Sequence, residues 1–132
     1  MLTGEYVHSQ TNGKYYGIAQ NLGRVLTSEY DKVLAEYDLI IMPTLTKRAT
    51  KLPLKEDYSV STAVATALDM IANTVAANVT GHPAITVDCR LSQEEKEKLP
   101  VGLMVVGKHW DERTVLRLAN AFTKEGKIKE SQ

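Results

Sequence analysis

The fold of this chain is decided by residues 73–87, Asn-Thr-Val-Ala-Ala-Asn-Val-Thr-Gly-His-Pro-Ala-Ile-Thr-Val, and by residues 99–106, Leu-Pro-Val-Gly-Leu-Met-Val-Val. The first stretch predicts the end of a helix, because Gly81 and Pro83 do not continue one, and then an alternating strand over 84–89. The second stretch predicts a buried strand over 101–106. Residues 92–98 between them are too charged to be buried and indicate a solvated loop or one surface helical turn.

Upstream of these strands, apolar residues recur every three, four or seven positions, which predicts a long amphipathic helix from Lys14 that is capped by Thr11 or Asn12. The apolar members of this helix are Ile18, Leu22, Val25, Leu26, Val33, Leu34 and Tyr37. Residues 1–13 are rich in Thr, Ser, Asn and Gly, whose side chains compete with regular structure. We expect an irregular entry there.

The apolar run 39–42, stopped by Pro43, predicts a strand that is buried on both faces. A second helix, capped by Asp57 or Ser59, is expected to be well buried and to run to Gly81. A last helix is expected to begin after Asp111 and to stop at Gly126. Its core side is predicted to carry Val115, Leu118, Ala119 and Phe122.

This order of elements predicts an α/β fold in which helices cover a mixed β-sheet. The expected organisation is an irregular entry over 1–13, a single α/β domain over 14–126 and a tail over 127–132. A length of 132 residues fits one domain, and 43% apolar with 24% charged residues is typical of a globular protein.

Charge and composition narrow the classes of partner. With 16 basic and 16 acidic residues the formal net charge is zero, which does not favour nucleic acid or an anionic membrane. The sequence shows neither a secretory signal pattern nor an apolar run near the ~20 residues that span a bilayer. Cys89 is the only cysteine, so no internal disulfide forms and no cysteine-based zinc site is completed. We expect a soluble, cytoplasmic protein.

Motifs for a nucleophile turn, a phosphate loop or a pair of histidines at metal-binding spacing are absent from the sequence. His82 and His109 have a pKa range suited to acid or base chemistry, but a structural or exposed role is favoured for both, and still more for His8. Cys89 is read as a small apolar residue that ends a strand. A triad of Ser59 or Ser61 with His82 and Asp88 has no supporting motif, so it is not adopted.

Four stretches resemble motifs of the amidase signature family and occur in the family's order. They are Tyr37-Asp38-Leu39-Ile40-Ile41-Met42-Pro43-Thr44, Thr80-Gly81-His82-Pro83-Ala84, Leu99-Pro100-Val101-Gly102 and Gly107-Lys108-His109-Trp110-Asp111-Glu112. The resemblance covers roughly residues 14 to 125 and is similar to the C-terminal part of the amidase signature fold, with the last stretch closest to free-standing amidases. It implies hydrolysis of a carboxamide C–N bond to carboxylate and ammonia.

The family uses a serine nucleophile, a second serine on a cis peptide, a lysine and an oxyanion hole of backbone N–H groups. The chain has no Gly-Gly-Ser-Ser-Gly-Gly-Ser run, so no position is assigned a catalytic role and the chain is expected to be inactive alone. The resemblance implies that Thr74, Ala77 and Trp110 line the substrate channel. For Trp110, core filling is an equal alternative, and for Thr74 and Ala77 core packing is the favoured alternative. No metal and no organic cofactor is implied.

Two hypotheses follow. In the first, the chain is the C-terminal portion of an amidase acting on small amides: a piece made for expression, a truncated gene product, or half of a split enzyme that joins a serine-bearing N-terminal half. In the second, it is a non-enzymatic interaction module or amidase remnant that pairs with a partner through a sheet edge. Both predict self-association or a partner, because strand edges and apolar surface would be exposed.

Overall fold

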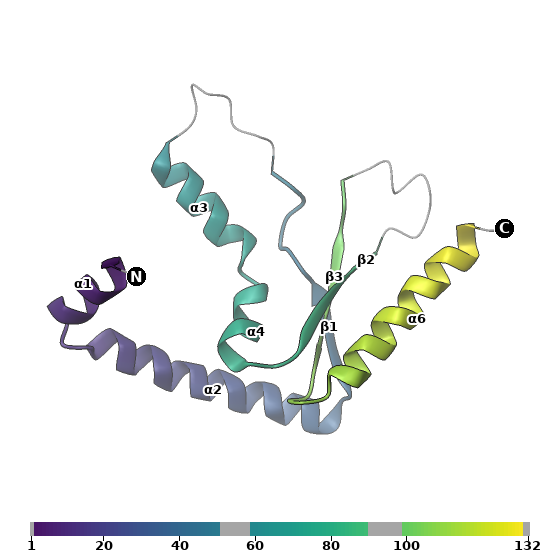
Figure 1. The fold of residues 1–132 in the computed structure, drawn as a ribbon, viewed down its shortest axis with the longest axis horizontal. Helices are drawn as coiled ribbons and strands as arrows, with labels where there is room; N and C mark the ends of the chain where they lie inside the picture. The colour runs from purple at the N-terminus through teal and green to yellow at the C-terminus, as the bar shows by residue number, and fades with distance from the viewer. Residues whose placement is uncertain (1, 51–58, 90–98, 131–132) are drawn as a thin grey trace.

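The computed structural model describes residues 2–50, 59–89 and 99–130 (Figure 1). In chain order the elements are α1 (Leu2–Gln10), α2 (Lys14–Glu36), β1 (Leu39–Pro43), α3 (Val60–Met70), α4 (Thr74–Thr80), β2 (Ala84–Asp88), β3 (Gly102–Gly107) and α6 (Glu112–Glu130). The predicted α/β class is therefore confirmed.

The three strands form one antiparallel sheet in the order β1-β3-β2, so the last strand in sequence is the central one. Val105 pairs with Ile41 on one side and with Ile85 on the other. Met104, Val105 and Val106 are all buried, as expected for a central strand. The expectation of a buried strand over residues 101–106 is thus confirmed, with the strand beginning at Gly102.

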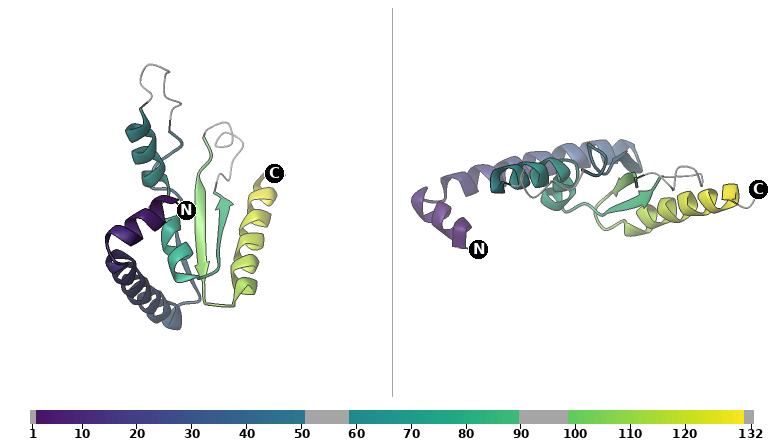
Figure 2. Two further views of the ribbon diagram at one scale, coloured as in Figure 1. Left: turned by 60° about the vertical axis from the view of Figure 1, so that its left-hand side comes forward. Right: turned by 90° about the horizontal axis from the view of Figure 1, so that it is seen from above.

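Helix α6 packs against β2 and β3 on one face of the sheet, where its Val115 and Ala119 are buried (Figure 2). A Cβ added to Gly107 would overlap the Cγ2 atom of Val115 and lie 3.5 Å from a methyl carbon of Leu39. Glycine at position 107 therefore allows the helix to approach the end of the central strand. Asp111 caps α6 as predicted, because its Oδ1 accepts a hydrogen bond from the backbone N–H of Thr114 at 3.3 Å.

The long helix α2 packs against α4 on the other side of the molecule, and its Leu34 is buried (Figure 1). The expected cap at Thr11 or Asn12 is wrong: Gly13 occupies the N-cap position with a φ of 69° and no side-chain cap bond. The reason is a preceding helix. Residues 2–10 form α1 instead of the irregular entry expected, and a tight turn at Thr11–Gly13 joins the two helices.

The single buried helix expected before Gly81 is also wrong, because it is broken into α3 and α4, which meet at 70°. The amide of Asn73 at the break donates to the Pro43 carbonyl at 2.8 Å, which ties the bend to the end of β1. Ser59 caps α3 as expected by accepting from the N–H of Thr62 at 3.1 Å, whereas the alternative cap, Asp57, lies outside the described residues.

Burial of these helices also differs from the prediction. No residue of α3 is buried, and α4 buries only Thr80. In Figure 1 α3 stands away from the sheet. Its large apolar side chains Val60, Val64, Leu68 and Met70 are thus exposed within the described structure, although the sequence pattern is that of a core helix.

Two smaller corrections concern the ends of the fold. Strand β1 is an edge strand whose Ile41 is 53% exposed, so it is not buried on both faces within the described part of the chain. The last helix does not stop at Gly126 but continues to Glu130, because one glycine costs a helix only about 1 kcal/mol. No single described helix is long and apolar enough to cross a membrane, and α3 with α4 passes that test only as a bent pair.

Candidate functional site

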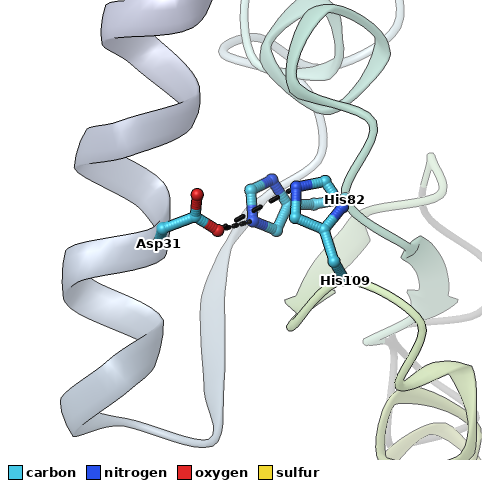
Figure 3. Close-up of side chains that lie close together, drawn as sticks. All are labelled: Asp31, His82 and His109. Atoms are coloured by element: carbon cyan, nitrogen blue, oxygen red, sulfur yellow. Dashed lines mark hydrogen bonds and ion pairs between the residues drawn. The ribbon is translucent and has the colours of Figure 1, made fainter.

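Three ionisable side chains from distant parts of the sequence meet at one end of the sheet: Asp31 on α2, His82 in the turn between α4 and β2, and His109 in the turn between β3 and α6 (Figure 3). Their ligand atoms all lie within 4.8 Å of one another. The cluster connects α2 to both turns at this end of the sheet. Among the described residues it is the group of His, Cys, Asp and Glu side chains close enough to hold a metal ion.

Local backbone structure fixes His82. Gly81 ends α4 with a φ of 76°, a left-handed conformation that glycine adopts without strain, and its N–H donates to the Ala77 carbonyl at 2.9 Å. The carbonyl of Pro83 then accepts a hydrogen bond from the N–H of Gly107 at 3.0 Å. This bond holds the turn that carries His82 against the end of β3.

The strand register brings His109 to the same place. Ala84 pairs with Val106, so the residues just before β2 lie beside those just after β3. The two imidazole rings are stacked, with centroids 3.9 Å apart and planes inclined by 28°. Tyr30 lies on α2 beside the pair, with its ring centroid 5.5 Å from that of His82.

Asp31 faces both rings. Its Oδ1 atom lies 3.3 Å from Nε2 of His82 and 3.9 Å from Nε2 of His109. A carboxylate only accepts, so the shorter contact requires a hydrogen on Nε2 of neutral His82. The Nδ1 atom of His82 is buried and has no hydrogen-bond partner among the described residues, and the same is true of Oγ1 of Thr80. The hydrogen bonding of this cluster is therefore incomplete within the described chain.

Burial controls the protonation of His82. Its side chain is fully buried, whereas that of His109 is 34% and that of Asp31 is 54% exposed. Desolvation lowers the pKa of His82 below its ordinary value of 6.5, and the nearby charge of His109 lowers it further, while the hydrogen bond and charge of Asp31 oppose both effects. Neutral His82 is the favoured form at neutral pH.

Asp31 also borders an open groove of about 590 Å³ between α2 and α4. The groove is lined by Ala19, Gln20, Gly23, Arg24, Thr27, Ser28, Asp31, Asn78 and Val79. Solvent and small solutes can reach Asp31 through this groove, whereas the side chain of His82 is fully buried and does not line the groove.

The residues predicted to line a substrate channel lie elsewhere. Thr74 and Ala77 are half-buried on α4, and the hydroxyl of Thr74 donates to the Ile71 carbonyl at 3.2 Å. Trp110 follows His109 with a φ of 64° and is 91% exposed. Within the described residues its indole therefore lines no enclosed pocket and fills no core.

Other candidates have ordinary structural roles. Cys89 is half-buried and its thiol donates to the Val101 carbonyl at 3.3 Å. Ser59 caps α3, and its hydroxyl lies 3.0 Å from that of Ser61. His82 pairs with Asp31, a residue that no sequence pattern singled out.

Comparison with known proteins agrees with the motifs. The sequence profile of the Amidase family matches residues 1–116. The chain is 44% identical over 117 residues to an enantioselective amidase of Rhodococcus rhodochrous, and 40% identical over 111 residues to one of the glutamyl-tRNA(Gln) amidotransferase subunits of Exiguobacterium sibiricum. It is 42% identical over 123 residues to an uncharacterized protein in the nthA 5' region of Rhodococcus erythropolis.

These matches cover 88%, 82% and 93% of this chain, respectively. The chain spans only 22% of the length of the Rhodococcus rhodochrous amidase, 21% of that of the amidotransferase protein and 59% of that of the uncharacterized protein. The profile match extends over most of the chain, and the expected family motifs fall within it. The chain therefore belongs to the amidase family, and it spans only part of the length of these relatives.

Proposed function

We propose that this chain is the C-terminal portion of an amidase that hydrolyses carboxamide C–N bonds to carboxylate and ammonia. The observation that carries the proposal is the 44% identity to an enantioselective amidase over 117 residues, in a chain that lacks the family's Gly/Ser-rich run. Its role is to supply strands of the sheet and part of the substrate channel, while the nucleophile, the second serine and the lysine lie in another part of the enzyme.

Exposed apolar surface supports this role. Helices α3 and α4 and the break between them expose large apolar side chains, namely Val60, Val64, Leu68, Met70, Ile71, Val75 and Val79. In the described sheet β1 and β2 each have a single neighbouring strand. Apolar helices and sheet edges of this kind are typical surfaces for contact with further protein. The serine-bearing portion of the enzyme is the partner that we propose for them.

The channel assignment rests on Thr74, Ala77 and Trp110. An indole that is 91% exposed beside a sharp turn is available to contact a substrate or a second protein segment, and both other residues lie on one helix that is partly exposed. In the proposed complete enzyme these side chains contact the acyl part of a small amide. The chain alone has no catalytic residue in this scheme.

A second function, that of a partner-binding module, is favoured by the edge strands and exposed apolar helices of this chain, and by relatives that are named as subunits. Several of these glutamyl-tRNA(Gln) amidotransferase proteins are 35–40% identical to this chain. A chain that keeps the sheet and the apolar helices can act as a non-enzymatic interaction module, pairing with a partner through β1 or β2. This alternative predicts a stable complex without amide hydrolysis.

The chemistry is tested with the purified chain. It is incubated with a fluorophosphonate serine probe, its intact mass is recorded, and ammonia release from a panel of simple amides is followed in parallel. We expect no adduct and no ammonia. A stoichiometric adduct together with turnover would show that a serine of this chain is the nucleophile and would overturn the assignment.

A further inference from the structure

We propose that Asp31, His82 and His109 bind one divalent transition-metal ion, of the class that takes imidazole and carboxylate ligands, with Zn²⁺ as the representative. Two histidines and one carboxylate make up a three-residue ligand set that proteins use for zinc with a fourth position left open. The site is separate from the amide chemistry proposed above and does not depend on it.

The spacing of two ligand atoms already suits such an ion. Bonds of 2.0–2.1 Å in tetrahedral geometry place two ligand atoms roughly 3.4 Å apart. Oδ1 of Asp31 and Nε2 of His82 are 3.3 Å apart, which is longer than a charge-assisted hydrogen bond of about 2.8 Å. An ion between these atoms therefore requires no movement of α2 relative to the turn that carries His82.

His109 has to turn. Its Nε2 atom is 3.9 Å from Asp31 Oδ1, and its ring is nearly parallel to that of His82, so the two lone pairs do not converge on one point. Rotation of the His109 ring about its terminal side-chain bond breaks the stack with His82 and turns Nε2 of His109 toward the ion. The ring has room for this movement, because the side chain is 34% exposed and lies in a turn.

The surroundings favour a cation. Asp31 supplies the negative charge, and the groove that it lines gives an ion access and leaves a position for water. The cation on the same groove, Arg24, is roughly 10 Å away along α2 and donates to the Asn21 side chain at 2.9 Å. Tyr30 contributes an uncharged ring beside His82. The two lysines next to the cluster in sequence, Lys32 and Lys108, pair with Glu29 at 2.6 Å and with Asp38 at 3.7 Å, respectively.

The Nδ1 atom of fully buried His82 has no hydrogen-bond partner among the described residues, and in the proposed site it carries the imidazole hydrogen while Nε2 binds the ion. Metal on Nε2 displaces the hydrogen from that atom to Nδ1 and releases the proton of any protonated imidazole, so the affinity rises with pH.

The test uses the full chain after treatment with a chelator. Titration with Co²⁺ is followed by its visible absorption, and titration with Zn²⁺ is followed by calorimetry and by the melting temperature. We expect one ion per chain, Co²⁺ bands in the range of four-coordinate sites and a higher melting temperature with Zn²⁺. Binding that is absent, or that gives the spectrum of hydrated Co²⁺, overturns the proposal.

Matched variants locate the ion. Asp31→Asn and His109→Gln change partly exposed side chains and are expected to fold, and each should weaken binding at least about tenfold. His8→Gln removes a histidine on α1 and Cys89→Ser removes the thiol; both should bind as the parent does. Unchanged binding in Asp31→Asn and His109→Gln, or loss of binding in His8→Gln or Cys89→Ser, would place the ion elsewhere and overturn the assignment.

Discussion

The imidazole rings of His82 and His109 are stacked, with centroids 3.9 Å apart, although 26 residues that include strands β2 and β3 separate them in sequence. Only one of the two rings is enclosed by protein, while the other reaches solvent. Burial, and then the nearby charge of His109, lower the pKa of His82, which makes the folded state sensitive to pH.

The first prediction concerns that sensitivity in metal-free protein. The pKa of His82 is lowered on folding, so the unfolded chain takes up the proton more readily, and stability falls as the pH drops below 6.5 and levels off below the folded pKa. Each unit of pKa lowering corresponds to about 1.4 kcal/mol. Urea unfolding between pH 5 and pH 8 in the presence of EDTA measures the effect.

The control for this prediction is His109→Gln, which removes the neighbouring charge but leaves His82 buried. Its unfolding free energy should depend less steeply on pH than that of the parent, since desolvation alone then lowers the pKa of His82. An equal or steeper dependence would show that the stacked ring does not contribute.

The second prediction concerns the contact between the central strand and the last helix. Gly107→Ala places a methyl group against the side chain of buried Val115, and it should destabilise the fold by about 1–3 kcal/mol. Gly17→Ala adds the same methyl group where nothing lies within 4 Å, on α2, and should stabilise by about 0.5–1 kcal/mol. Chemical denaturation of both variants would contradict the packing account if their effects had the same sign.

The third prediction concerns the cap of α6. The hydrogen bonds from Thr114 hold the pKa of Asp111 below its ordinary value of 3.8, so this cap contributes stability above that pH and loses it as the pH falls through the folded pKa. Thr114→Val removes the hydroxyl bond and should raise the pKa of Asp111 toward 3.8 in a carboxyl ¹³C NMR titration. Thr123→Val, about two and a half turns further along the helix, should leave the pKa of Asp111 unchanged.

The fourth prediction concerns the apolar surface of α3. Leu68→Glu removes an exposed apolar side chain and adds a charge, so it should shift the chain toward monomer in sedimentation velocity at high protein concentration. Ser61→Glu adds the same charge to the same helix without removing apolar surface and should have a smaller effect. Monomeric behaviour of the parent chain at all concentrations would show that this surface does not drive self-association.

Local signals explain what the sequence predicted correctly. Ser59 and Asp111 cap their helices through contacts between residues three apart, which the sequence shows directly. The run Met104–Val106 is buried because a continuous apolar run is favoured where both faces of a strand are covered. The family motifs were also recognisable, since each is a short stretch that contains a turn or a strand start.

Contacts between distant residues explain what the sequence did not predict. The break between α3 and α4 contains neither Gly nor Pro, and it is held by a bond from Asn73 to the Pro43 carbonyl, 30 residues earlier. His82 and His109 lie far apart in sequence, and only the pairing of Ala84 with Val106 brings them together. Asp31 belongs to no sequence motif, and a single aspartate on a helix does not indicate a functional site.

The most direct test of the proposed function is the amidase activity of a chimaera. The 117-residue segment of the Rhodococcus rhodochrous enantioselective amidase that aligns with this chain is replaced by the corresponding residues of the chain, and ammonia release from small amides is measured. We predict measurable hydrolysis and one fluorophosphonate-labelled serine outside the replaced segment. A chimaera that folds with a cooperative melting transition, yet neither hydrolyses amides nor takes up the label, would contradict the proposed function.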